Sequence, residues 1–336
     1  MSPVVKISAV LIVFVFLTSD ALAQKKTGKK PSRRTAYLNA KEAGTDFAVQ
    51  GEYVGEVTTD DGKTRVGIQV IALGKGKFRA VAYPGGLPGD GWDGKTKITA
   101  DGETKNGIPT FQGDKGSATI ENKVMTVLTK AGIVQGKLKK TLRVSSTMNR
   151  KPPKGAVVLF DGSTAKHFKN GKMTKDGLLQ QGVTSKRKFQ SFQLHIEFQL
   201  SFMPYARGQG RSNSGVYMQS RYEVQILDSF GLAGKHNECG GVYSIHDPDV
   251  NMCYPPLSWQ TFDIDFTAAQ FDDTGKKIKN ARMTVRHNGV VIHKDLELPK
   301  STTAAPVKVG PAAGPLYIQN HGNPVRFRNI WLVEKK

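Results

Sequence analysis

The segment Phe192–Leu200 alternates without interruption between apolar and polar residues. Its apolar members are Phe192, Leu194, Ile196, Phe198 and Leu200. A period of two residues is typical of a β-strand with one buried face, because successive side chains point to opposite sides. The polar members, His195 and Glu197 among them, are therefore expected to face solvent or a groove lined by the sheet.

Similar strand patterns follow one another through the second half of the chain, and no helical pattern separates them. They cover residues 215–219, 222–227, 259–266, 282–287, 290–294, 316–320 and 325–333. Asn288-Gly289 is a hairpin turn signal between two of these strands. Because parallel sheets need crossover helices, these patterns predict an antiparallel sandwich for residues 151–336.

The first half is also rich in strand patterns, at residues 53–58, 66–73, 78–83, 97–100, 117–120 and 123–129. A short helix is expected over residues 36–47, and Asp61-Gly62 is a second hairpin signal. We therefore expect residues 36–150 to form a smaller all-β domain, either a barrel or half of a sandwich. No motif assigns a role to it. The run Lys151-Pro152-Pro153-Lys154-Gly155 is typical of a stiff linker.

Residues 1–23 have the pattern of a secretory signal peptide. Lys6 precedes an apolar run over residues 7–17, and Ala21-Leu22-Ala23 is a small-x-small cleavage site. The alternative is an uncleaved anchor, which the shortness of the apolar run disfavours. The chain is therefore expected to be exported to the periplasm or the extracellular space, with no transmembrane segment after cleavage.

The chain is strongly basic, with a formal net charge of +21. Residues 24–35 carry six Lys and Arg side chains and no acid, which predicts a flexible basic tail. Such a charge favours anionic partners, and an anionic cell-surface polymer is the partner expected for the tail. Export makes nucleic acid an unattractive partner, and no nucleic-acid-binding motif is present. The alternative is a basic surface that is simply solvated.

Two cysteines, Cys239 and Cys253, leave two possibilities open: a disulfide formed in an oxidising compartment, or two buried free thiols. No cofactor and no metal site are expected. The acidic and histidine residues at 236–249 resemble a calcium-binding loop only loosely, because they lack its full spacing. Structural calcium therefore stays a minor alternative.

Several motifs of the second half occur in an order that resembles the 3-keto-disaccharide hydrolase domain. They are Leu159-Phe160-Asp161-Gly162, Asn213-Ser214-Gly215-Val216-Tyr217, the segment 222–228, Gly240-Gly241-Val242-Tyr243, Trp259-Gln260-Thr261, the segment 318–322 and Phe327-Arg328-Asn329-Ile330. The resemblance implies a concanavalin-A-like jelly roll that cleaves or binds sugars oxidised at carbon 3. One departure is that the family often has an aromatic residue soon after Leu-Phe-Asp-Gly, whereas Lys166-His167-Phe168 occupies that region here.

Related jelly-roll glycosidases carry Glu-x-Asp-x-x-Glu on one strand, whereas this chain has Glu223-x-Gln225-x-x-Asp228. An amide cannot be a nucleophile, so the retaining mechanism with two carboxyl groups is disfavoured. A 3-keto sugar needs only one base, donors to the ketone oxygen and a proton source for the leaving group. The candidate catalytic residues are Glu223, Asp228 and His321. The candidate substrate-binding residues are Asn213, Arg221, Gln225, Tyr243, Trp259 and Gln319.

Each candidate has a structural alternative. Glu223 would pair with Arg221 along the strand, and Asp228, whose parity points it away from Glu223, would cap a turn. His321 would hold a turn, Asn213 would form a strand-entry turn, and Trp259 would belong to the core. At the level of the protein, the alternatives to a keto-glycoside hydrolase are a non-catalytic carbohydrate-binding envelope protein and an ordinary glycosidase.

Overall fold

Strands make up nearly all of the regular structure of the protein, so the all-β prediction is confirmed. A computed structural model describes residues 31–60 and 62–335. The predicted signal peptide and residues 24–30 of the predicted basic tail lie outside these residues. Within the described part of the chain, no helix combines the length and apolar character needed to cross a bilayer.

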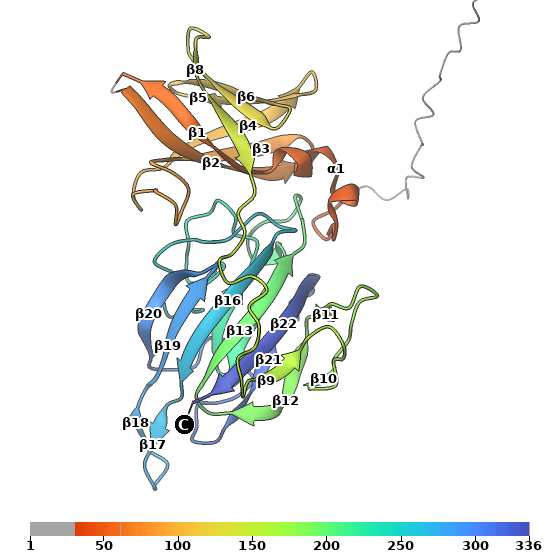
Figure 1. Ribbon diagram of the computed structural model, residues 1–336, viewed down its shortest axis with the longest axis vertical. Helices are drawn as coiled ribbons and strands as arrows, with labels where there is room; N and C mark the ends of the chain where they lie inside the picture. Colours follow the sequence, from red (N-terminus) through yellow and green to blue (C-terminus); the bar gives the residue numbers. More distant parts are fainter. Residues whose placement is uncertain (1–30, 61, 336) are drawn as a thin grey trace, which may run out of the picture. The chain divides into compact units, whose positions relative to one another are not determined.

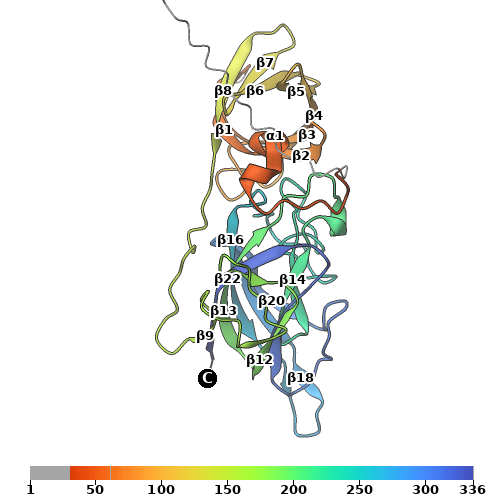
Figure 2. The ribbon, with the colours of Figure 1, turned by 90° about the vertical axis from the view of Figure 1, so that its right-hand side faces the viewer.

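Eight antiparallel strands of the first half close into a barrel, in which each strand pairs with the next and β8 returns to β1 (Figure 2). They are β1 (Gly51–Thr59), β2 (Gly62–Gly74), β3 (Lys77–Pro84), β4 (Ile98–Lys105), β5 (Ile108–Gly113), β6 (Gly116–Glu121), β7 (Val124–Thr129) and β8 (Val134–Thr141). The sequence patterns did not predict β5 and β8. In β8 only Leu138 is buried, so the apolar alternation is too weak to identify the strand.

A helix, α1 (Ala40–Val49), precedes the barrel close to the range expected from the sequence. Its first turn is capped by Asn39, whose side-chain oxygen accepts the Glu42 N–H at 3.0 Å.

The second half forms two antiparallel sheets, which Figure 1 shows in green to blue. The five-stranded sheet has the order β10 (Phe168–Lys169), β12 (Val183–Phe189), β21 (Gly314–Ile318), β14 (Ser214–Met218), β15 (Tyr222–Ile226). The seven-stranded sheet has the order β11 (Leu179–Gln180), β22 (Val325–Glu334), β13 (Phe192–Leu200), β16 (Trp259–Thr267), β19 (Ala281–His287), β20 (Val290–Leu298), and β9 (Val157–Phe160) pairs with β22. A separate two-stranded sheet joins β17 (Gln270–Phe271) and β18 (Lys277–Lys279), and a short 3-10 helix spans Gly208–Gly210.

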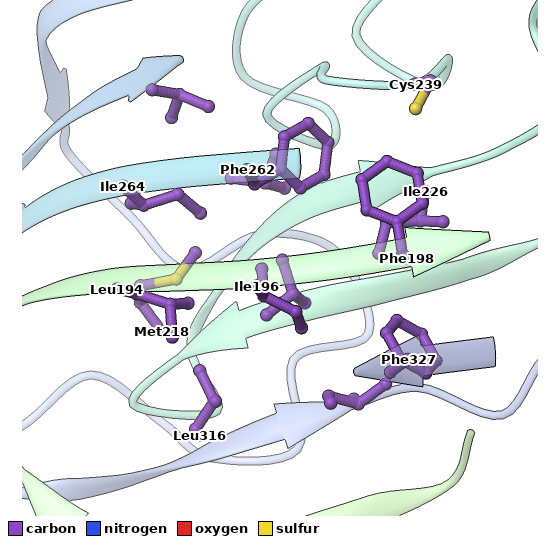
Figure 3. Close-up of a cluster of buried hydrophobic side chains, with 14 of the residues drawn as sticks. Leu194, Ile196, Phe198, Met218, Ile226, Cys239, Phe262, Ile264, Leu316 and Phe327 are labelled. Carbon is purple, nitrogen blue, oxygen red and sulfur yellow. The ribbon is translucent and has the colours of Figure 1, made fainter. Parts of the chain in front are cut away.

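The apolar faces of the two sheets form one core (Figure 3). Leu194, Ile196 and Phe198 of β13 are buried there together with Phe262 of β16. From the five-stranded sheet come Met218, Ile226 and Leu316. The alternation of residues 192–200 thus does bury one face of a strand, as the sequence predicted.

The middle of the opposite face of β13 is buried, which corrects the expectation for His195 and Glu197. Both side chains are 0% exposed, because residues 145–150 lie across this face. We call these residues the strap. The backbone N–H of Asn149 donates to Glu197 Oε1 at 2.6 Å, and His195 Nδ1 lies 2.8 Å from Asp263 Oδ1. The parity was correct, but the sequence pattern of a strand carries no information about a distant segment that covers it.

Candidate active site

The hairpin formed by β14 and β15 carries the centre of the candidate site. Its register places Tyr217 opposite Glu223 and Gly215 opposite Gln225. Val216 and Val224 point into the core between the sheets, so Tyr217 and Glu223 point to the outer face of the five-stranded sheet. The turn of the hairpin contains Gln219 and Ser220, both with positive φ.

A cavity of about 120 Å³ opens on this outer face. It is lined by Gln209, Asn213, Tyr217, Glu223, Gln225, Tyr243, Thr303, Ala304, Gln319 and His321. The structure therefore brings together six of the nine residues proposed from the sequence. We call this space the site cavity.

Glu223 is the one carboxyl group among the described residues that line the site cavity. Its side chain is nearly inaccessible, with the residue 3% exposed. Burial raises the pKa of Glu223 to about 8, although a hydrogen bond with the Tyr217 phenol acts in the opposite direction. A carboxyl group with such a pKa exchanges its proton near neutral pH, which suits a general base or acid.

The ion pair between Glu223 and Arg221 that the sequence left open is absent from the described contacts. Arg221 instead donates from Nε to the Lys308 carbonyl at 2.8 Å and from a terminal nitrogen to Gln219 Oε1 at 2.8 Å. It does not line the site cavity, so its predicted contact with substrate is not supported. Because no cation of the described residues pairs with it, Glu223 keeps the raised pKa that burial imposes.

Gly215 makes room for the Glu223 carboxyl group. A Cβ atom at residue 215 would lie 2.0 Å from Glu223 Oε1, closer than any two such atoms can approach. The carboxyl group therefore rests on the backbone of the neighbouring strand. Residue 215 of the Asn-Ser-Gly segment is therefore a glycine for a steric reason: a side chain at this position would displace the candidate base.

Amide side chains surround Glu223 in the site cavity. Gln319 Nε2 donates to the Tyr217 hydroxyl at 3.0 Å, and Gln225 Nε2 donates to Gln209 Oε1 at 2.9 Å. Asn213 Nδ2 donates to the same Gln209 oxygen at 2.9 Å. The buried Oδ1 of Asn213 has no hydrogen-bond partner among the described residues, so it is an acceptor available to a hydroxyl group.

His321 and Tyr243 complete the cavity at its accessible side. His321 is exposed, and no described side chain hydrogen-bonds to its ring. Tyr243 is half-buried, and its backbone N–H donates to the Glu223 carbonyl at 3.4 Å. An imidazole and two phenols, those of Tyr217 and Tyr243, thus lie around a single carboxyl group.

Two further predicted site residues lie elsewhere, and the reasons are clear from their contacts. Asp228 is 2% exposed and pairs with Arg211, whose Nε lies 2.6 Å from Asp228 Oδ2. Because Asp228 has the opposite parity, its side chain points away from Glu223 and cannot act with Glu223 in catalysis. Trp259 begins β16 in the other sheet, where the Arg328 guanidinium lies 4.0 Å from its ring centroid.

The cysteines and the acidic loop have structural roles in the described residues. Cys239 and Cys253 are both buried free thiols, so the structure shows the second of the two possibilities stated above rather than the disulfide. Asp247 accepts the His236 N–H at 2.5 Å, and Glu238 accepts the Gly234 N–H at 2.6 Å. Within residues 31–60 and 62–335, no group of three or more His, Cys, Asp or Glu side chains converges on a metal-binding position.

Four lining residues were missed by sequence reasoning: Gln209, Tyr217, Thr303 and Ala304. Tyr217 has a detectable signal, because it shares the parity of Gly215 and pairs with Glu223 across a short hairpin turn. Thr303 and Ala304 lie in the connection between β20 and β21. The neighbouring Thr302 Oγ1 accepts the Glu223 N–H at 3.0 Å. No local pattern indicates that this connection reaches the site.

The arrangement is suited to proton abstraction next to an electrophilic centre. One carboxyl group with a pKa near neutrality supplies the base, and amide and phenol groups supply donors to a developing negative charge. The two-carboxylate mechanism of ordinary glycosidases requires a second acid about 5–10 Å away across the sugar. None of the other described residues that line the site cavity is an acid.

Comparison with known proteins bears on the second half of the chain. The family model described as "3-keto-alpha-glucoside-1,2-lyase-like domain" matches residues 155–333, which confirms the resemblance drawn from the ordered motifs. No curated protein matches the chain.

Two solved structures from Parabacteroides distasonis, each described as a "putative glycosyl hydrolase", are similar to parts of the chain. The first has 28% identity and a TM-score of 0.48, covering 62% of this chain and 99% of its own. The second has 16% identity and a TM-score of 0.40, covering 55% of this chain and 95% of its own.

Proposed function

Since the chain belongs to the family of the 3-keto-alpha-glucoside-1,2-lyase-like domain, we propose that it cleaves glycosides whose sugar is oxidised at carbon 3. The family supports a hydrolase-like activity on carbohydrate. The observation that carries the finer proposal is the isolated Glu223 carboxyl group, buried and with a pKa raised to about 8.

In the proposed reaction, Glu223 removes the proton from carbon 2, which the neighbouring ketone makes acidic. The electrons of the C–H bond form an enolate on the ketone oxygen, and amide donors of Gln225 and Gln319 stabilise it. When the ketone re-forms, the bond from carbon 1 to the leaving oxygen breaks, and a carbon 1–carbon 2 double bond results. His321 gives a proton to the leaving oxygen. Water then adds its hydroxyl to carbon 1 and a proton to carbon 2, so the net reaction is hydrolysis.

Tyr217 has a positioning role in this proposal. Burial and the nearby Glu223 carboxylate strongly raise the pKa of the Tyr217 phenol, so it stays protonated. Gln319 Nε2 holds the phenol oxygen at 3.0 Å. The phenol proton is therefore available to Glu223, and it fixes the carboxyl group in one orientation.

The test compares a nitrophenyl 3-keto-glucoside with the unoxidised nitrophenyl glucoside. We expect nitrophenol release from the keto substrate and a slower rate when carbon 2 carries deuterium, because that C–H bond breaks. Glu223→Gln should lower kcat by at least about 100-fold, whereas Glu121→Gln, an exposed glutamate of the barrel, should leave it unchanged. Equal release from both substrates, or full activity of Glu223→Gln, would contradict the proposal.

A second candidate is a non-catalytic carbohydrate-binding protein, which the aromatic rings of Tyr217 and Tyr243 in the site cavity favour. Convergence of a carboxyl group and an imidazole favours catalysis over binding alone. Saturable binding of a 3-keto glycoside by the wild-type protein with no product at any pH would support this second candidate.

We propose in addition that the protein is exported, on the basis of residues 1–23 alone. The positive, apolar and small-residue regions of this segment support cleavage before Gln24. Mass spectrometry of the protein recovered from the periplasm or medium should give Gln24 as the first residue. Recovery of the full-length chain in the membrane fraction would contradict it.

A further inference from the structure

A second, larger hollow adjoins the site cavity. It has a volume of about 710 Å³ and is lined by Arg33, Arg34, Ala206, Arg207, Gln209, Gly210, His321, Gly322 and Asn323. Gln209 and His321 line both spaces, so the two hollows adjoin at these residues. We call the larger one the arginine groove.

Hydrogen bonds hold the segment that carries Arg33 and Arg34. Tyr37 and Phe202 exchange backbone hydrogen bonds of 2.9 and 3.0 Å, which attach the segment to the chain just before Arg207. A turn precedes this bridge, in which the Thr35 N–H donates to the Ser32 carbonyl at 2.9 Å. The two arginines are therefore presented by a turn next to an anchored bridge.

The positive charge of the arginine groove is not compensated by the part of the chain that the structure describes. No Asp or Glu is among the described residues that line it. Among the described residues, Arg33, Arg34 and Arg207 form no ion pair with a carboxylate. Arg207 donates instead to three carbonyls, those of Pro204 and Ala206 at 2.7 Å and of Leu73 at 2.8 Å. Carbonyls orient a guanidinium group but do not neutralise its charge.

The arginines also repel one another. Burial, followed by the charges of Arg211 and Arg33, lowers the pKa of Arg207, and Asp228 offsets only part of this effect. A cluster of like charges is stabilised when an anion binds between them, because the anion replaces repulsion by attraction. Gly210 and Gly322 leave open space on the wall, with no atom within 4 Å of where a Cβ would lie.

We propose that the arginine groove binds an anionic group, a carboxylate or a sulfate ester, on the part of the saccharide next to the sugar held in the site cavity. The natural substrate would then be an acidic saccharide rather than a neutral one. This inference rests on the proposed function, which places the keto sugar in the site cavity. It adds that the saccharide unit next to this sugar is acidic. Guanidinium groups suit such anions because they offer paired donors.

The test measures binding by calorimetry, so that it does not depend on turnover. The probes are a trigalacturonate, a sulfated trisaccharide and the neutral maltotriose, each with the wild-type protein and with Arg33→Gln/Arg34→Gln. Both substituted residues are exposed, so folding should be unaffected. Arg207 is left intact because it holds backbone carbonyls. The control variant is Arg286→Gln/Lys294→Gln, which removes two exposed charges from β19 and β20.

We expect at least one acidic probe to bind the wild-type protein more tightly than maltotriose does, with an affinity that falls as salt rises. The Arg33→Gln/Arg34→Gln variant should lose about tenfold of that affinity, and the control variant should lose little. The acidic probe that binds more tightly identifies the recognised anion as a carboxylate or a sulfate ester. Equal binding of neutral and acidic probes, or equal losses in both variants, would overturn the proposal.

The outcomes also separate this inference from the proposed function. Tight binding of an acidic probe together with no cleavage of any 3-keto glycoside would leave the groove assigned and remove the catalytic proposal. Cleavage of a 3-keto glycoside without any preference for an acidic neighbour would leave the catalytic proposal and remove the groove.

Discussion

Burial of the Glu223 carboxyl group lowers the stability of the folded protein when that group is charged. Its pKa of about 8 lies far above the usual value of 4.5, because burial disfavours the charged form. Between these two pH values the folded protein holds the proton more tightly than the unfolded chain does. The free energy of unfolding therefore decreases as pH rises through this window. The charged base forms only at this cost, which is typical of functional sites.

Substituting Glu223→Gln should remove this dependence, because an amide does not ionise. The difference in Tm between the variant and the wild-type protein should grow in favour of the variant from pH 6 to pH 9. Thermal melts followed by circular dichroism at both pH values check this. A constant difference in Tm across the range would mean that the Glu223 carboxyl group is not shifted as the structure indicates.

The titration of Glu223 should also control the rate of the proposed proton abstraction, which should increase with pH whereas stability decreases. The base form of Glu223 increases as pH rises toward its pKa of about 8, so kcat/KM for a 3-keto glycoside should rise through this region. A pH–rate profile of the wild-type protein checks the rise. A profile that is already flat from pH 5 upward would assign the base to another group.

Gly215 offers an independent test of the position of Glu223. In Gly215→Ala the new methyl group would displace the carboxyl group, which is the end of a flexible side chain and can rotate away. Misplacing a base by about 1 Å costs up to about 100-fold in rate. We expect kcat to fall by that order while Tm changes little. Gly113→Ala, in barrel strand β5, is the control, since its nearest atoms are at 3.7 Å.

At the scale of elements, the β14–β15 hairpin and the strap differ in how far the sequence predicts them. The two strands of the hairpin could be predicted from their alternation, which also determines which side chains of one strand share a face. The strap could not, since residues 145–150 carry no regular pattern. It is held by side chains of the sheet below: Thr147 Oγ1 donates to Asp263 Oδ2 at 2.6 Å, and Trp331 Nε1 donates to the Arg150 carbonyl at 3.1 Å.

Glu197 is the centre of the contacts under the strap. Burial alone would raise its pKa, but hydrogen bonds from His195, Asn329, Arg328 and the Asn149 N–H lower the pKa to about 2. The folded protein therefore gains stability from Glu197 above about pH 4.5, and this gain is lost as pH falls through about 2. The attachment of the strap thus depends on the charged carboxylate of Glu197 inside the protein.

We expect Glu197→Gln to lower the free energy of unfolding by about 3 kcal/mol at pH 7, the lower end for breaking a buried ion pair. The lower end applies because the partner Arg328 is 33% exposed. Urea unfolding of the variant beside Glu121→Gln checks the value. A loss no larger than that of the control would show that the strap does not need the charge.

At the scale of the whole molecule, the described residues from Pro31 onward form one compact unit by their contacts. Ile71, Val81 and Tyr83 of the barrel belong to the same cluster of buried residues as the core of the sandwich. Arg143 adds to this: it pairs with Glu52 of the barrel at 2.5 Å, and its guanidinium lies 4.8 Å from the ring centroid of Tyr254 in the sandwich. The barrel and the sandwich are therefore expected to unfold together.

Differential scanning calorimetry of the wild-type protein should show a single transition for this reason. In Glu52→Gln the largely buried Arg143 loses its carboxylate, at a cost of about 3–5 kcal/mol. We expect a lower Tm, with the sandwich and the barrel beginning to melt separately. Two resolved transitions already in the wild-type protein would contradict the coupling.

The fold class, the main strands of the sandwich, the family and most of the candidate site could be predicted from the sequence. These properties depend on side-chain alternation, turn residues and the order of motifs, all of which are local along the chain. Glu223 and Gln225 could be placed on one face for this reason, since parity along a single strand is a local property.

Which of these groups are buried, and which segments cover them, became known only from the three-dimensional structure. Asp228 became an ion-pair partner of Arg211, and His195 became a buried residue under the strap. The pKa of Glu223 depends on its burial and on the phenol of Tyr217, which lies on the neighbouring strand. Burial is set by segments distant in sequence, and the pattern of one strand carries no record of them.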